Sequence, residues 1–108
     1  MQPYEIQADF FKSISSPVRI KILKLLISRN SCVTDIAGVL KEPQPQVSKA
    51  LIALKKAGIV ESSRTGKKSC YSIKRQEIAQ ILALSEKIIT TESEKVMLAF
   101  NKRKAKAV

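Results

Sequence analysis

The sequence predicts a mainly α-helical domain with one small β-hairpin, in the order helix, helix, short strand, helix, helix, strand, strand, helix. Three observations support this fold class. Apolar residues recur at three- and four-residue intervals over most of the 108 residues, as in amphipathic helices. Pro17 and Pro45 suit the first turns of helices, and Gly58 follows a helical pattern that it would end. Residues 64–68, R-T-G-K-K, indicate the tip of a tight hairpin.

Residues 4–14 predict a first amphipathic helix, because Ile6, Phe10 and Ile14 recur at four-residue intervals. Phe10 and Phe11 are adjacent and therefore point in different directions. We expect one ring in the core and the other against a partner subunit. The alternative is that both rings belong to the core.

A second helix is expected from Pro17 to about Arg29, with the Ser16 side chain as its N-cap. Its apolar residues cover more than one face, which predicts the central buried helix of the domain. Asn30 follows the last periodic residue and is expected in the left-handed conformation of a helix C-cap.

The next stretch predicts a helix-turn-helix. After an extended piece at 31–33, a third helix is expected over 35–41, followed by a turn at 42–44 and a fourth helix from Pro45 to Ala57. Apolar side chains at helical spacing are expected to face inward: Ile36, Val39 and Leu40 in the third helix, and Val47, Ala50, Leu51, Leu54 and Ala57 in the fourth.

The opposite face of the fourth helix combines amides, a hydroxyl and ammonium groups. Amides bridge adenine edges, Lys reaches guanine or phosphate, and the positive end of the helix favours phosphate. A solvated helix face has a similar composition, but the preceding helix and turn favour a recognition helix that binds double-stranded DNA. The expected DNA-facing residues are Gln44, Gln46, Ser48, Lys49, Lys55 and Lys56.

A hairpin is expected after Gly58, with strands at 59–61 and 69–73. Its tip carries the basic side chains of Arg64, Lys67 and Lys68, and these are expected to contact DNA phosphate or the minor groove. A hairpin in this position is typical of a wing, so the whole pattern predicts a winged helix-turn-helix.

A terminal helix is expected from about Arg75 to Phe100, and its length of roughly 38 Å exceeds what a domain of this size covers alone. We therefore expect dimerisation through the first and last helices; the alternative is a helix lying wholly on its own domain. Residues 1–101 are expected to form one domain, followed by a basic tail at 102–108. The expected dimerisation residues are Phe10, Phe11, Ile78, Ile81, Leu82, Ile88 and Ile89.

The net charge of +11, from 20 Lys and Arg against 9 Asp and Glu, favours a polyanionic partner such as nucleic acid. The sequence has no apolar run of about 18 residues and no signal segment, so a cytoplasmic protein without membrane contact is expected. Two Cys and no His argue against a structural zinc site. We expect no cofactor and no catalytic residue, because a histidine base and a glycine-rich phosphate loop are both missing.

Three runs of the sequence carry a family resemblance: S-S-P-V-R-I-K-I-L-K-L-L, P-Q-P-Q-V-S-K-A-L-I-A-L-K-K-A-G-I-V and R-T-G-K-K-S-C-Y-S-I. With them, the chain resembles the ArsR/SmtB-type winged-helix repressors over roughly residues 8–90. The resemblance implies a homodimer on an imperfect palindrome, released or retuned by a chemical signal. Gln44, Gln46, Ser48 and Lys49 match the base-facing start of that family's recognition helix.

The sequence departs from the family at three places. Cys32-Val33-Thr34 replaces the Cys-Val-Cys of many metal sensors, and the absence of His argues against the zinc site of others. Pro43 stands where a Ser usually caps the recognition helix, so the cap is expected from Glu42 or Gln44.

Cys32 and Cys70 are the only two thiols. In winged-helix folds the extended segment before the third helix can pair with the second hairpin strand, which would bring them together. We hypothesise a reversible disulfide that couples oxidation to the wing. Strand alternation argues against it, because Cys70 faces away from Tyr71 and Ile73; the alternative is two unrelated thiols.

The sequence therefore predicts a homodimeric repressor that binds a palindromic operator and responds to a thiol-based redox signal or an unidentified small molecule. Three alternatives stay open. They are an architectural DNA-binding protein without an effector, an arsenite-type metalloid sensor with a rearranged thiol site, and a protein-interaction module.

Overall fold

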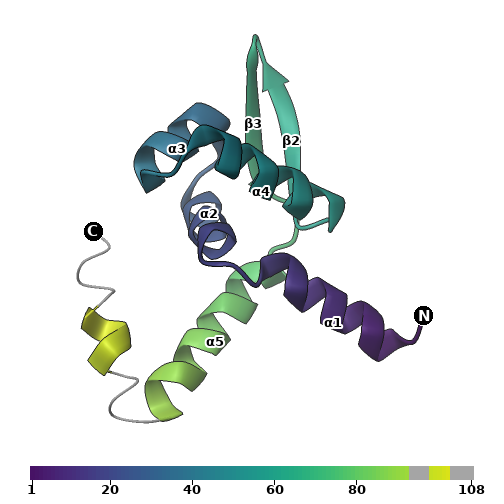
Figure 1. Ribbon diagram of the computed structural model, residues 1–108, viewed down its shortest axis with the longest axis vertical. Coiled ribbons are helices and arrows are strands. Elements are labelled where there is room, and N and C mark those ends of the chain that lie inside the picture. The colour runs from purple at the N-terminus through teal and green to yellow at the C-terminus, as the bar shows by residue number, and fades with distance from the viewer. Residues whose placement is uncertain (93–97, 103–108) are drawn as a thin grey trace. The chain divides into compact units, whose positions relative to one another are not determined.

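A computed structural model describes residues 1–92 and 98–102 and confirms the mainly helical fold class (Figure 1). The chain divides into two compact units, Met1–Gln76 and Glu77–Val108, which are described separately. The elements are α1 (Pro3–Ile14), α2 (Pro17–Ser28), β1 (Ser31–Cys32), α3 (Val33–Leu40), α4 (Gln44–Lys56), β2 (Val60–Thr65), β3 (Lys68–Ile73) and α5 (Glu77–Glu92).

Helix α2 begins as predicted but ends differently. The Ser16 hydroxyl oxygen accepts a hydrogen bond from the backbone N–H of Arg19 at 3.3 Å, which confirms the N-cap. The predicted left-handed C-cap at Asn30 is wrong. The helix ends at Arg29 in an extended conformation (φ −168°, ψ 149°), because the chain enters strand β1 only two residues later.

Helix α4 ends in a Schellman motif at the predicted glycine. Gly58 has a φ of +76°, and its N–H donates to the Lys55 carbonyl at 3.0 Å, while the Ile59 N–H donates to the Leu54 carbonyl at 3.1 Å. Ala57, predicted to face inward, is instead the exposed C-cap residue, because the helix has already begun to unwind there.

The core of the first unit is centred on α2, which contacts α3, α4 and β3. Val39 is a correction: it is 51% exposed, because it lies about 60° around the eight-residue α3 from the buried Ile36 and borders the open space beside Arg29 instead of the core. The buried side chains of this unit include Ile22, Leu23, Leu26, Ile36, Val47, Leu51, Leu54, Ile59 and Val60.

The three strands form one antiparallel sheet in the order β1-β3-β2. The predicted pairing of the segment before α3 with the second hairpin strand is confirmed, since Ser31 lies opposite Tyr71 and Cys32 opposite Cys70. The strands of the hairpin run further than predicted, to Thr65 and from Lys68, because Gly66 (φ +65°) allows a two-residue loop.

The second unit contains α5, whose 16 residues span about 24 Å. Residues 98–102 are also helical. The predicted continuous helix to Phe100 includes residues 93–97, and the predicted basic tail includes 103–108; both segments lie outside the described residues. The expectation of a single domain over residues 1–101 stays a prediction.

Adjacent residues of α4 provide a test of this core. Leu51 is 0% exposed, and Leu51→Ala is expected to lower the free energy of unfolding by about 2–5 kcal/mol through the cavity it leaves. Ile52 is 56% exposed, so Ile52→Ala should change that free energy by less than about 0.5 kcal/mol. Urea denaturation of both variants checks the difference, and equal losses would contradict the assigned faces.

Candidate nucleic-acid interface

Helix α4, which the sequence predicts to be the recognition helix, begins without a side-chain cap. Pro43 is the N-cap residue, and its carbonyl accepts hydrogen bonds from the N–H groups of Gln46 and Val47, both at 3.1 Å. The predicted cap by Glu42 or Gln44 is therefore wrong. The physical reason is that this backbone carbonyl starts the helix and no side chain of the preceding turn accepts from its first N–H groups.

The turn before α4 is fixed by the backbone and by one ion pair. Lys41 adopts the left-handed conformation (φ 55°, ψ 45°), and the Glu42 N–H donates to the Ala37 carbonyl at 3.1 Å. The Lys21 ammonium of α2 lies 3.2 Å from a carboxylate oxygen of Glu42. Both interactions position the first turn of α4 relative to α2 and α3.

Helix α4 has one buried face and one open face. Its buried residues, Val47, Ala50, Leu51 and Leu54, pack in the core of the first unit and confirm that part of the predicted inward face. The open face carries the predicted amide and ammonium groups, so these side chains are available to a duplex. Gln44, Gln46, Lys49, Lys55 and Lys56 are exposed, and Ser48 is half-buried.

Lys55 also connects the recognition helix with the wing. Its ammonium donates a hydrogen bond to the Ser62 hydroxyl of β2 at 2.7 Å. The sequence pattern placed Lys55 on the open face but gave no sign of Ser62, because this contact depends on how β2 lies beside α4. The bond holds the helix and the wing in one arrangement.

The wing carries its cations on both sides. Arg64 lies opposite Ser69, and its guanidinium donates to the Ser69 hydroxyl at 3.5 Å. Lys68 lies opposite Thr65, one position further along, so Arg64 and Lys68 project from opposite faces of the ribbon. Lys67 is exposed in the loop between the strands. Figure 1 shows this hairpin tip projecting beyond the helices of the first unit.

Cys32 and Cys70 are directly opposite each other in the β1–β3 ladder, with Cα atoms 3.8 Å apart, and their sulfur atoms are joined as a disulfide. Residues directly opposite each other on neighbouring strands have their side chains on the same side of the sheet. Cys32 and Cys70 therefore share one side, and the alternation of Cys70 with Tyr71, which argued against the bridge, does not separate the two thiols. The bond closes a loop over a sequence separation of 38, which contains α3, α4 and β2. In the loop-entropy model such a cross-link stabilises by about 4 kcal/mol.

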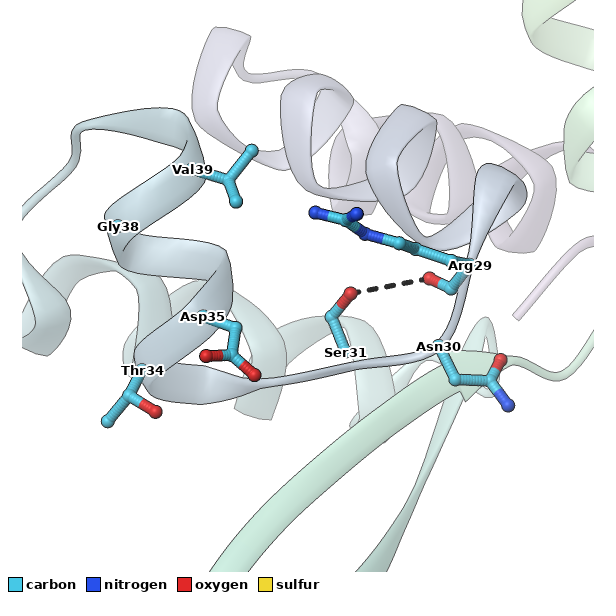
Figure 2. A pocket seen from close by; sticks show the side chains of 7 residues that line it. All are labelled: Arg29, Asn30, Ser31, Thr34, Asp35, Gly38 and Val39. Carbon is cyan, nitrogen blue, oxygen red and sulfur yellow. Dashed lines mark hydrogen bonds between the residues drawn. The ribbon is translucent and has the colours of Figure 1, made fainter.

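An open hollow that the sequence pattern did not reveal lies between the end of α2, β1 and α3 (Figure 2). The Arg29 side chain reaches toward Val39, and the Ser31 hydroxyl donates to the Arg29 carbonyl at 3.4 Å. Most of the lining side chains are exposed, so this is a surface feature rather than an enclosed cavity. Its lining residues are Arg29, Asn30, Ser31, Thr34, Asp35, Gly38 and Val39.

The predicted dimerisation residues differ in exposure. Phe10 and Phe11 make an edge-to-face pair with centroids 5.4 Å apart, and Phe11 is 48% exposed, so the alternative in which both rings are core residues is wrong. Their role in dimerisation stays a prediction. In α5, Ile78 and Leu82 are buried, Ile81 is half-buried, and Ile88 and Ile89 are exposed.

The described residues contain neither a metal-binding cluster nor a membrane-spanning helix. Over 1–92 and 98–102, no three His, Cys, Asp or Glu side chains gather in a group that could hold a metal ion. Within the same ranges, every helix is too short or too polar to cross a membrane.

The chain is similar to known regulators in sequence and in fold. Residues 16–62 match the family model described as bacterial regulatory protein, arsR family. An uncharacterized HTH-type transcriptional regulator of Methanocaldococcus jannaschii is 40% identical over 89 residues, covering 82% of this chain and 100% of the relative.

Two solved structures share the fold. The crystal structure of Mycobacterium tuberculosis Rv0081 has 34% identity and a TM-score of 0.74 over 82% of this chain and 90% of that one. The homodimeric winged helix-turn-helix DNA-binding domain of Mb0332 from Mycobacterium bovis has 29% identity and a TM-score of 0.71 over 79% of each chain. This chain therefore belongs to the arsR family of transcriptional regulators, which bind DNA through a winged helix-turn-helix.

Proposed function

We propose that this protein is a homodimeric transcriptional repressor that acts in the cytoplasm, binds a palindromic operator and responds to the redox state of Cys32 and Cys70. The single observation that carries the proposal is the pairing of two DNA-facing elements in one unit. The open face of α4 presents amide and ammonium groups, and the wing beside it presents three cations. A protein that bound only phosphate would need no amides at the start of α4.

The homodimer is supported by one relative and by exposed apolar side chains. The Mb0332 domain is described as homodimeric. Each of the two units has exposed apolar side chains that a second copy could cover: Phe11 in α1 of the first unit, and Ile88 and Ile89 in α5 of the second. Two copies related by a two-fold axis would present two recognition helices to two half-sites, which accounts for the palindrome.

The redox response is supported by the position of the disulfide. Strand β3 is the middle strand, so Cys70 joins β1 on one side and pairs with Ser63 of the wing on the other. In the reaction, two protein thiols transfer two electrons and two protons to a small-molecule disulfide, which leaves as two thiols. The bond restrains the loop that contains α3, α4 and β2, so the oxidised form is expected to bind the operator more tightly.

The first test compares specific with random DNA. At fixed salt, footprinting should show protection of a palindrome in the chain's own upstream DNA, with half-site centres about 34–36 Å apart. Gln46→Ala should weaken operator binding by roughly 5–150-fold for each half-site, because each lost base-edge contact contributes about 1–3 kcal/mol, and should leave random DNA unaffected. Gln80→Ala, an exposed amide of α5, is the control.

The alternatives give different results in the same assay. Equal affinity for the operator and for random duplex would contradict a repressor and favour an architectural DNA-binding protein. Absence of binding to either duplex would favour a protein-interaction module.

The wing is tested by its salt dependence. Lys67→Ala should reduce the slope of log Kobs against log[salt] by about 0.9 for each wing, because one phosphate contact is lost. Lys74→Ala is the matched control: it removes the same charge from an exposed residue at the other end of the hairpin, about 20 Å from the tip. Fluorescence anisotropy at several salt concentrations gives both slopes, and an equal decrease would contradict a wing contact.

The redox proposal is tested by binding under two conditions. Protein treated with oxidised glutathione should bind the operator at least roughly fivefold more tightly than protein treated with a reductant, which is the lower end of typical coupling between sites. The double variant Cys32→Ser, Cys70→Ser should show no difference. Two titratable thiols in protein oxidised in this way would show that the bridge does not form.

A further inference from the structure

Ile52 is an aliphatic side chain on the open face of the recognition helix. It is 56% exposed, and among the exposed positions of α4 it is the one large aliphatic residue. The other exposed residues of this helix are Gln44, Pro45, Gln46, Lys49, Lys55 and Lys56.

Helix geometry places Ile52 near the middle of this face. With 3.6 residues per turn, Ile52 lies about 150° around the helix axis from the centre of the buried stripe formed by Val47, Ala50, Leu51 and Leu54. Lys49 precedes it by three residues and Lys56 follows it by four, so an ammonium group lies one turn away in each direction. An α4 docked by these cations would bring Ile52 toward the duplex.

The chemistry of the major groove supplies a partner for such a side chain. The 5-methyl group of thymine is the apolar feature that base edges present there, and aliphatic side chains contact it directly. We propose that Ile52 contacts the 5-methyl group of a thymine in each operator half-site and thereby selects an A·T pair. This inference rests on the proposed function, since it requires α4 to enter the major groove.

A different assignment would leave Ile52 as an ordinary exposed side chain, which is common on protein surfaces. Val39 of α3 is the matched comparison, because it is an aliphatic residue of similar exposure, 51%, on another helix. It is not flanked by the recognition-helix residues. Comparing variants of Ile52 and Val39 therefore distinguishes an effect of contact with DNA from an effect of exposure alone.

The experiment replaces each thymine of the operator, one at a time, by deoxyuridine. This change removes the 5-methyl group and keeps the base pair and its hydrogen bonds. The wild-type protein should lose roughly fourfold in affinity at one thymine of each half-site, which corresponds to about 0.8 kcal/mol for one buried methyl. Fluorescence anisotropy at fixed salt measures each duplex.

Three variants complete the test. Ile52→Ala should lose most of the difference between the thymine and deoxyuridine duplexes, because the atoms beyond Cβ that would reach the methyl group are removed. Ile52→Val, which keeps a branched side chain, should retain part of the difference, and Val39→Ala should retain all of it. Circular dichroism and urea denaturation of Ile52→Ala confirm that the exposed substitution leaves the fold intact.

The outcomes distinguish this inference from the proposed function. If the wild-type protein prefers its operator but no single deoxyuridine weakens it, or if Ile52→Ala keeps the full methyl dependence, the inference is overturned and the repressor stands. If the wild-type protein binds operator and random DNA equally, both fail.

Discussion

The burial of one face of α4 is the constraint on which the rest of this molecule depends. Val47, Leu51 and Leu54 occupy a single stripe, and each is fully buried. A helix that buries one stripe against α2 and α3 must leave its opposite face open, so the same packing that stabilises the domain also exposes the amide and ammonium groups of that face. Stability and recognition thus share one helix but use separate residues, which allows either to change without destroying the other.

The wing depends on this helix through several contacts that lie outside the core. Gly58 ends α4 and turns the chain directly into the hairpin, and the bond from Lys55 to Ser62 holds β2 beside the helix. Strand β3 then joins the hairpin to β1 and, through Cys70, to Cys32. Strand β3 and the disulfide therefore connect the segment before α3 to the wing by a continuous set of covalent and hydrogen bonds.

The two kinds of DNA contact have different energetic roles. Cations at the wing tip and along α4 supply attraction that any duplex shares, and this attraction weakens with salt. In the proposed complex with an operator, selectivity comes from groups that match base edges: the amides, one hydroxyl and the aliphatic Ile52 on the open face of α4. In this proposal the high positive charge of the chain supplies affinity for any duplex, and the uncharged residues on the open face of α4 supply selectivity for the operator sequence.

Local chemistry in the sequence predicted the order of the elements and the exposed polar face of α4, because helix periodicity, the Ser16 cap and the Gly58 stop act within a few residues. The same local reasoning failed at Asn30, Val39 and the start of α4, where neighbouring elements fixed the chain. The pairing of Cys32 with Cys70 and the bond from Lys55 to Ser62 were decided by the tertiary structure. Each depends on which surfaces meet when distant segments pack, and no periodicity along the chain encodes that.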